Sequence, residues 1–158
     1  MNLIVAVDQN WAIGLNGDQL FYLSQDLKRF RSLTLGHPVI LGRKTLATFP
    51  GEKPLKGRRN LILSRDPAFA PEGTEVFQDL EALLTAAPED AFVIGGASVY
   101  QALLDRCDTA YVTKVEAAFP ADCWFPNLDQ RPEWRLTAEE PVQEEQGLCF
   151  RYLVYRRT

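Results

Sequence analysis

Asp26 is the residue in this 158-residue chain whose setting most directly suggests acid–base chemistry. A helix is predicted from Gln25 to about Thr34, with Ser24 as its N-cap. At about 100° per residue, Asp26 falls on the apolar arc of this helix rather than on the polar arc. The apolar arc collects Leu23, Leu27, Phe30, Leu33 and Thr34, and the polar arc collects Gln25, Lys28, Arg29 and Arg31.

A carboxylate on an apolar face must be paired or protonated, because an isolated buried charge is expensive. A polar ligand rich in hydrogen-bond donors would supply the partner for Asp26. An acid in the first turn can also do no more than interact favourably with the helix dipole. The sequence leaves both interpretations open.

A second candidate site lies where a short apolar run turns into a helix. Phe92, Val93 and Ile94 form a run typical of a buried strand, and helical spacing begins after Gly95-Gly96 and continues to Leu104. With no side chains at the junction, the free N–H groups at the helix start can bind an anion such as a phosphate. The same glycine pair also suits an ordinary tight turn.

A similar junction follows the apolar run from Pro38 to Leu41. Gly42-Arg43-Lys44-Thr45 resembles the end of a Walker A loop, but the earlier glycine of that motif is missing. The segment is therefore not a P-loop. It still places two cations and a hydroxyl beside the start of a short helix that runs to about Thr48, which favours a second phosphate contact.

The net charge of −4 conceals an uneven distribution of basic residues. Ten of them fall between Lys28 and Arg65, where Glu52 is the single acid, whereas acids predominate from Asp66 to Phe150. A local positive field can attract an anionic ligand despite an unfavourable total charge. The alternative is a basic face that is simply solvated.

Several classes of site are disfavoured by composition. The single histidine, His37, excludes mechanisms that need two, and three widely spaced cysteines favour neither a disulfide framework nor a zinc site. We expect no metal. The amino terminus has no basic n-region and no run approaches a membrane span, so we expect a cytoplasmic protein with one domain over residues 1–158.

Strands and helices alternate along most of the chain, which predicts an α/β fold. Eight strands are expected, at Leu3–Val7, Pro38–Leu41, Asn60–Ser64, Thr74–Phe77, Phe92–Ile94, Thr109–Glu116, Trp134–Thr137 and Leu148–Tyr155. The last two would form a C-terminal antiparallel pair beside a mostly parallel sheet. A further helix is expected at Leu80–Ala86, and the polar stretch Asp8 to Gln19 is a candidate lid. Ligands in such folds bind at the carboxyl ends of the strands.

Taken in order, several short motifs resemble the dihydrofolate reductase family along the whole chain. They are Ile13-Gly14, Leu20-Phe21 with Asp26 and Phe30, Val39 to Thr45, Gly57 to Asn60, Leu63-Ser64-Arg65, Val93 to Tyr100 and Tyr111-Val112-Thr113. The resemblance implies a single domain in which four helices flank a central, mixed, mostly parallel eight-stranded sheet.

The resemblance also implies an activity: NADPH-dependent reduction of dihydrofolate to tetrahydrofolate, which serves one-carbon metabolism. Hydride passes to the pterin ring and a proton to the adjacent nitrogen. Asp26 would accept hydrogen bonds from the pterin with Thr113 supporting it, and Arg58 would bind a carboxylate of the glutamate tail. The other expected substrate-binding residues are Ile4, Val5, Ala6, Phe30, Phe49 and Ile94.

For the cofactor, the resemblance implies contacts at both junctions and at a site for the 2′-phosphate. The nicotinamide would lie near Ala6, Ile13 and Gly14, under a lid running from Asp8 to Leu23. Ser64 and Arg65 would hold the 2′-phosphate, which favours NADPH over NADH. The remaining expected contacts are Gly42, Arg43, Lys44, Thr45, Ile94, Gly95, Gly96, Ala97, Ser98, Val99 and Tyr100. In the family the Gly-Gly peptide is cis.

The chain departs from the commonest family pattern at Leu20-Phe21, Leu46 and Ala97, which bears on lid motion, the water route for the proton and antifolate affinity. Dihydrofolate and antifolate-type small molecules are the expected partners, with no nucleic acid and no membrane, and the chain is expected to be a monomer. The alternatives are a reductase for another pterin or pyrimidine, a non-catalytic folate-binding protein, and a nucleic-acid-binding domain that uses the basic quarter. No nucleic-acid motif supports the last.

Overall fold

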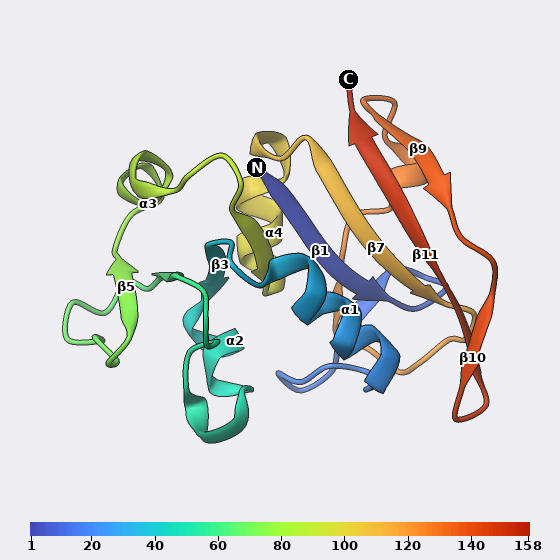
Figure 1. The fold of residues 1–158 in the computed structure, drawn as a ribbon, viewed down its shortest axis with the longest axis horizontal. Helices are drawn as coiled ribbons and strands as arrows, with labels where there is room; N and C mark the ends of the chain where they lie inside the picture. The colour runs from blue at the N-terminus through green and yellow to red at the C-terminus, as the bar shows by residue number, and fades with distance from the viewer.

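A twisted sheet forms the centre of the computed structural model, which describes residues 1–158 (Figure 1). The strand order is β10-β11-β7-β1-β6-β3-β4-β5, and β9 pairs with β11 beside β10. The strands are β1 Asn2–Val7, β3 Val39–Gly42, β4 Asn60–Leu63, β5 Thr74–Phe77, β6 Phe92–Gly95, β7 Thr109–Val115, β9 Trp134–Glu139, β10 Gln143–Glu145 and β11 Leu148–Arg157.

The sheet confirms the expected architecture. All pairs from β7 across to β5 are parallel, and β11 runs antiparallel to β7, β9 and β10. Because β9 and β10 both pair with β11, they share one edge position, and the sheet is eight positions wide. The expected C-terminal antiparallel pair is β9 with β11.

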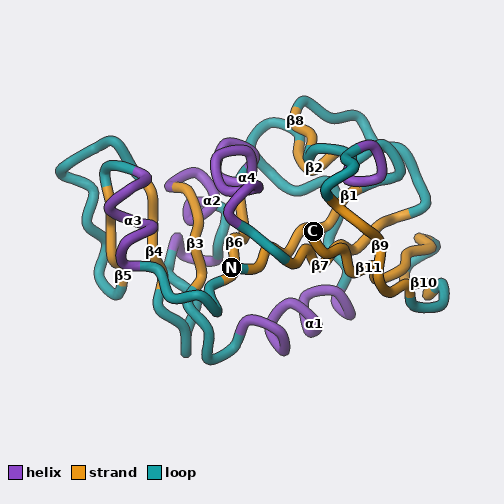
Figure 2. Tube along the Cα trace, turned by 90° about the horizontal axis from the view of Figure 1, so that it is seen from above, coloured by secondary structure: helices purple, strands orange, loops and turns teal.

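Four helices flank this sheet, as expected: α1 Ser24–Thr34, α2 Arg43–Ala47, α3 Leu80–Ala86 and α4 Ala97–Leu103. Three 3-10 turns accompany them, at Pro50–Glu52, Leu104–Arg106 and Leu128–Gln130. In Figure 2, α1 lies on one side of the sheet and α4 lies on the other. None of the helices is both long and apolar enough to span a lipid bilayer.

The apolar core is divided by the sheet because successive strand residues face opposite sides. Leu3, Val5 and Val7 of β1 belong to the large cluster that also contains Val99 and Leu103 of α4. Ile4, between them, belongs to a second cluster against which Phe30 of α1 packs. The two apolar clusters therefore use alternate residues of the same strand.

The stretch Asp8 to Gln19 is more ordered than the sequence suggested. It contains a short strand, β2 (Ala12–Gly14), which pairs with β8 (Cys123–Trp124) to form a separate two-stranded sheet. Gly14 also lets the Asp18 carbonyl oxygen approach closely, because an added Cβ would lie 3.1 Å from that oxygen. The candidate lid is thus tied to a distant segment of chain.

Candidate active site

Asp26 and Thr113 form a hydrogen-bonded pair between α1 and β7. The Thr113 hydroxyl donates to Asp26 Oδ1 over 2.6 Å, and the Thr113 side chain is buried. Burial raises the pKa of Asp26, while the Thr113 hydrogen bond and the charge of Arg29 oppose the rise and the charge of Glu145 adds to it. The structure therefore brings these two predicted residues together and makes the carboxyl easier to protonate.

The start of α1 differs from the sequence prediction. Leu23 is the N-cap and makes no side-chain capping bond, and Ser24 lies inside the first turn. Glu145 of β10 instead accepts hydrogen bonds from the N–H groups of Ser24 and Gln25. A cap supplied from so far along the chain leaves no signal in the local sequence.

Two further residues of α1 lie outside their predicted environments. Leu27, placed on the apolar arc, is 49% exposed because Phe30 and Leu33 make the contacts with the sheet. Arg29, placed on the polar arc, lies with its guanidinium carbon 4.0 Å from the centre of the Tyr152 ring. Arg29 Nη1 is buried and has no hydrogen-bond partner in the chain, and the guanidinium interacts with this aromatic face.

An apolar wall adjoins the Asp26–Thr113 pair. Ile4, Leu46 and Ile94 are buried members of one cluster, and Phe30 and Phe49 pack against it. Ala6 lies opposite Thr113 in the β1–β7 register and is partly exposed. Val5 was also expected to line the site, but its side chain belongs to the cluster on the other face of the sheet, so a ligand contact there would fall to its backbone.

Arg58 lies at the other end of α1 from Asp26. Its Nη1 donates to Thr34 Oγ1 over 3.0 Å and its Nε donates to the Lys56 carbonyl over 2.9 Å. Burial and the charge of Arg31 lower the pKa of Arg58. Thr34 was predicted only as part of the apolar arc, whereas the structure shows it orienting the guanidinium.

The pocket beside Arg58 has a volume of about 330 Å³ and is also lined by His37 and Arg59. Arg59 pairs with Glu75 through two bonds of 2.8 Å, and His37 Nδ1 lies 2.9 Å from Asp90 Oδ2. Arg58 has no carboxylate partner in the chain. It is therefore the cation of this pocket that is left to bind an external carboxylate.

The two strand-to-helix junctions lie against each other. A Cβ added to Gly42 would lie 3.2 Å from Val99 Cγ2, and one added to Gly96 would lie 3.2 Å from Thr45 Oγ1. The starts of α2 and α4 have no side-chain caps, and the Gly95–Gly96 peptide is cis, as the family resemblance implied. Free N–H groups from both helices thus meet around backbone that no side chain obstructs, which suits a pyrophosphate.

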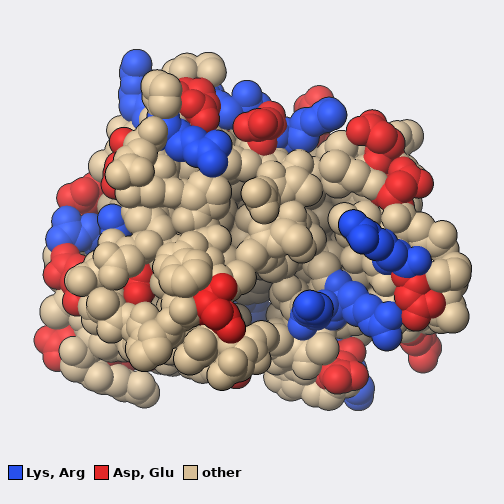
Figure 3. All heavy atoms as spheres, turned by 180° about the vertical axis from the view of Figure 1, so that it is seen from behind, with Lys and Arg blue, Asp and Glu red and all other residues tan.

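The remaining predicted cofactor residues are distributed around these junctions. Ser98 is exposed in the first turn of α4, and Tyr100 is buried with its hydroxyl donating to the Ile4 carbonyl over 2.7 Å. Ser64 is buried after β4 while Arg65 and Lys44 are exposed. Figure 3 shows basic side chains gathered beside a hollow, at the end of the molecule that carries β3 to β5. Arg43 already pairs with Asp66 over 3.1 Å and stacks on Phe69.

Asp8 is a residue that sequence reasoning missed. Its fully buried carboxylate accepts hydrogen bonds from the N–H groups of Asn10, Ala12 and Phe119, and so anchors the start of the lid that carries Ile13 and Gly14. An acid directly after a buried strand was the available signal.

Replacing Asp8 with Asn is expected to lower the free energy of unfolding by about 2 kcal/mol, because the amide nitrogen leaves a buried N–H donor without an acceptor. Urea unfolding would measure the loss. Asp122→Asn is the matched control, since the exposed Asp122 accepts a single N–H, from Asn16 of the same lid. Equal stability of the two variants would contradict this anchoring role.

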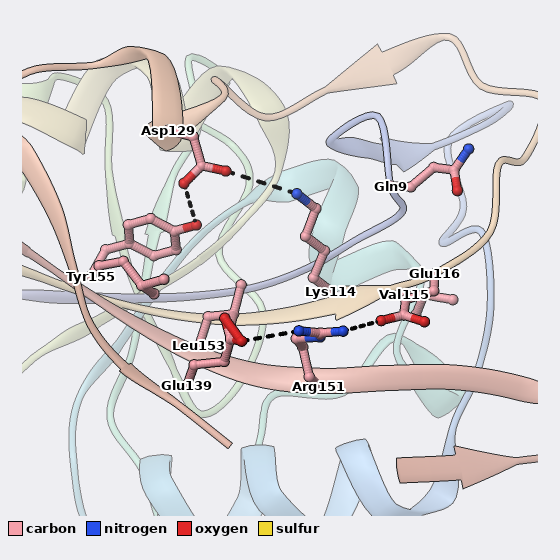
Figure 4. A pocket seen from close by; sticks show the side chains of 10 residues that line it. Gln9, Lys114, Val115, Glu116, Asp129, Glu139, Arg151, Leu153 and Tyr155 are labelled. Atoms are coloured by element: carbon pink, nitrogen blue, oxygen red, sulfur yellow. Dashed lines mark hydrogen bonds and ion pairs between the residues drawn. The ribbon is translucent and has the colours of Figure 1, made fainter. Parts of the chain in front are cut away.

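A separate pocket of about 450 Å³ lies on the face of the sheet away from Asp26 (Figure 4). Lys114, next to Thr113 in β7, points into it and lies 3.9 Å from Asp129. Arg151 pairs with both Glu116 and Glu139, and Tyr155 donates to Asp129. These charged groups already have partners within the pocket, so it presents no unpaired charge to a ligand.

No group of three or more His, Cys, Asp or Glu side chains is arranged to hold a metal ion.

Comparison with known proteins identifies the family to which this site belongs. The profile of the dihydrofolate reductase family matches residues 1–157. The dihydrofolate reductase of Mycobacterium tuberculosis (strain H37Rv) is 37% identical over 162 residues, covering 100% of this chain and 98% of that protein. The Bacillus subtilis (strain 168) enzyme is 33% identical over 161 residues, covering 99% and 94%.

A solved structure agrees with these sequence matches. Dihydrofolate reductase from Enterococcus faecalis, complexed with NADP(H) and RAB-propyl, superposes with a TM-score of 0.88 at 30% identity, covering 99% of this chain and 95% of that one. Sequence and fold agree from end to end, and this chain belongs to the dihydrofolate reductase family.

Proposed function

We propose that this chain reduces dihydrofolate to tetrahydrofolate with NADPH, and that Asp26 and Thr113 hold the pterin. The observation that carries the assignment of residues is the Asp26–Thr113 pair, with a raised Asp26 pKa, beside an apolar wall. A flat, donor-rich heterocycle fits these surroundings because its edge can satisfy the carboxylate while its faces contact Ile94, Phe30 and Phe49.

Asp26 accepts hydrogen bonds from the pterin amino group and a ring N–H, which orients the ring. Its negative charge also stabilises the pterin when the nitrogen beside the reacting carbon is protonated. The apolar wall excludes water and strengthens that electrostatic effect. When bound, NADPH supplies the hydride that goes to this carbon, and the proton on the nitrogen completes the reduction.

The residues at the glycine junctions fit the cofactor. A Cβ at Gly96 or Gly42 would crowd Thr45 or Val99, so glycine lets the two junctions pack closely. It also leaves the N–H groups at the helix starts without a side chain over them, which suits a phosphate. Thr45 and the first turn of α4 would hold the pyrophosphate, with Lys44 near it. Ser64 and Arg65 would hold the 2′-phosphate, and Ala6, Ile13 and Gly14 would adjoin the nicotinamide.

Replacing Arg65 with Gln is expected to weaken NADPH binding by about tenfold and to leave NADH binding unchanged. Arg65 is exposed, and a charge-assisted bond to a phosphate contributes about 1.5 kcal/mol or more. Fluorescence titration with both cofactors would measure the change, and NADH serves as the internal control. A parallel loss for the two cofactors would place Arg65 away from the 2′-phosphate.

We also propose that the protein acts as a cytoplasmic monomer without nucleic acid. All proposed ligand contacts come from one chain, and Cys107, Cys123 and Cys149 are free thiols. Within the basic quarter, Arg43 and Arg59 are already paired with Asp66 and Glu75. Light scattering during size-exclusion chromatography would test the monomer.

The direct test of function is the fall in NADPH absorbance on mixing the purified protein with dihydrofolate. We expect oxidation that depends on dihydrofolate and prefers NADPH to NADH. Tight cofactor binding without oxidation would point to a reductase for another pterin or pyrimidine. Binding of folate alone, with no turnover of any pterin, would indicate a non-catalytic folate-binding protein.

A further inference from the structure

The first turn of α1, which carries Asp26, has no cap of its own. Its N-cap residue, Leu23, makes no side-chain hydrogen bond, although the first N–H groups of a helix have no partners within the helix. Ser24 does not take this role, because it lies inside the helix. The N–H groups that begin the proposed catalytic helix therefore depend on a partner from elsewhere in the fold.

Glu145, the last residue of β10, supplies that partner. Its Oε2 accepts from the Ser24 N–H over 2.6 Å, and its Oε1 accepts from the Gln25 N–H over 3.0 Å and from the Ser24 hydroxyl over 3.1 Å. These three hydrogen bonds lower the pKa of Glu145, with the Gln25 bond as the largest cause, so the carboxylate is ionised at neutral pH. Both oxygens are thus engaged by the residues immediately before Asp26.

The hairpin that carries Glu145 holds this carboxylate in place. Glu145 pairs with Leu148 across a two-residue turn formed by Gln146 and Gly147, both of which have positive φ. A turn with two positive φ angles matches the twist of an antiparallel hairpin and fixes its register. Glu144 therefore points to the opposite face from Glu145.

We propose that Glu145 is a positioning residue for the reaction: it caps α1 from β10 and fixes the first turn that presents Asp26 to the pterin. The proposal rests on the role of Asp26 given above. Glu145 also acts through charge, since an anion beside Asp26 makes that carboxyl harder to ionise. The Glu145 carboxylate thus sets both the place of Asp26 and its readiness to hold a proton.

Several other polar and charged groups act on Asp26, and the test must distinguish their effects from that of Glu145. Arg29 of α1 and the Thr113 hydroxyl of β7 favour its ionised form, whereas Glu145 opposes it. The charge of Asp26 also acts on two phenols, raising the pKa of Tyr100 in α4 and of Tyr152 in β11. Lys28 interacts with Glu145, and Glu140 with Tyr152. Of these groups, Glu145 is the one that bonds to the first-turn backbone.

The test uses Glu145→Gln and Glu145→Ala beside Glu144→Gln and Glu144→Ala. Glu144 is the neighbouring acid, is exposed and makes no side-chain hydrogen bond, so its variants match the change in net charge and hairpin sequence. The Asp26 carboxyl is titrated by ¹³C NMR in the ligand-free protein, with Asp26→Asn identifying its signal. Steady-state kinetics with dihydrofolate and thermal unfolding are measured on the same samples.

Both Glu145 variants are expected to lower the pKa of Asp26, because they remove a nearby negative charge. Glu145→Ala should also raise the KM for dihydrofolate by about fivefold, because the first turn of α1 then no longer holds Asp26 in place; fivefold corresponds to the roughly 1 kcal/mol that a helix cap contributes. Glu145→Gln retains an acceptor and should keep most of the wild-type KM. The Glu144 variants should match the wild type in both measurements.

An Asp26 titration in the Glu145 variants that coincides with that of the Glu144 variants overturns the proposal. This holds even if Glu145→Ala unfolds at a lower temperature, because Glu145 would then be merely structural. If Glu145→Ala does not fold, Glu145→Gln decides the question. The titration needs no turnover, so a wild-type protein that fails to reduce dihydrofolate contradicts the proposed function without obscuring this result.

Discussion

Replacing Asp26 with Asn is expected to lower kcat/KM for dihydrofolate at neutral pH by about 10²- to 10⁴-fold, the usual range for loss of a group that assists proton transfer. The amide still bonds to Thr113, so the shape of the site is kept while its charge is lost. Steady-state NADPH oxidation from pH 5 to 9 would measure the loss. NADPH affinity should not change.

The pH dependence distinguishes the loss of this charge from general damage. Wild-type activity should fall as pH rises through the raised pKa of Asp26, because the proton then leaves the carboxyl–pterin pair. In Asp26→Asn, activity should be low near neutrality and recover as pH falls, since protonation must then come from solvent. A variant that retains the wild-type pH profile would show that Asp26 has no part in handling the proton.

The same substitution is expected to stabilise the fold at neutral pH. Burial raises the pKa of Asp26 from its ordinary value of 3.8, so the folded protein binds this proton more tightly than the unfolded chain does. The free energy of unfolding therefore decreases as pH rises from the unfolded pKa through the raised folded pKa. Asp26→Asn should be more stable than the wild type above that range and match it below pH 3.8. Urea unfolding at both pH values would measure the difference.

Replacing Arg58 with Ala is expected to raise the KM for dihydrofolate by about a hundredfold, because a charge-assisted pair between guanidinium and carboxylate is lost. The effect on kcat should be much smaller, since the glutamate tail lies away from the reacting atoms. Arg58→Lys should recover only part of the affinity, because the ammonium cannot reproduce the two-pronged contact. Steady-state kinetics at saturating NADPH would measure these differences.

Arg59→Ala is the matched control for Arg58→Ala. The two arginines are adjacent and carry the same charge, but Arg59 is already paired with Glu75. Its removal should leave the KM for dihydrofolate within about twofold of the wild type, because exposed charge pairs contribute little. Similar increases in KM for the two variants would indicate general electrostatic attraction rather than a specific contact with Arg58.

The strands and the glycine junctions could be predicted from the sequence because their signals are local. Phe92 to Ile94 form an apolar run that ends at a glycine pair, and β6 and α4 meet there in the structure. The α3 boundaries, Leu80–Ala86, also follow from helical spacing that begins after Asp79, whose side chain caps Ala82. In these cases the residues that determine the structure lie within one or two helical turns of each other.

The side of the sheet that each residue of β1 faces could not be predicted from the local sequence. The run Leu3 to Val7 indicates a buried strand but does not say which residues face the ligand. The parallel pairing with β6 and β7 decides which residues face which side. It places Ile4 in the cluster beside Phe30 and Val5 in the core on the opposite face. The pairing depends on residues about a hundred positions further along the chain.

The sequence by itself determined the strand–helix order, the open backbone at Gly95-Gly96 and the position of Asp26 on the inner side of its helix, because these follow from residue types at short spacing. Only the tertiary structure decided which distant side chains form hydrogen bonds with Asp26, with Arg58 and with the start of α1. Thr113 reaches Asp26 from β7, Thr34 orients Arg58, and Glu145 caps α1 from β10. Hydrogen bonds and charges act over a few ångströms in space, and the fold alone sets which distant residues come that close.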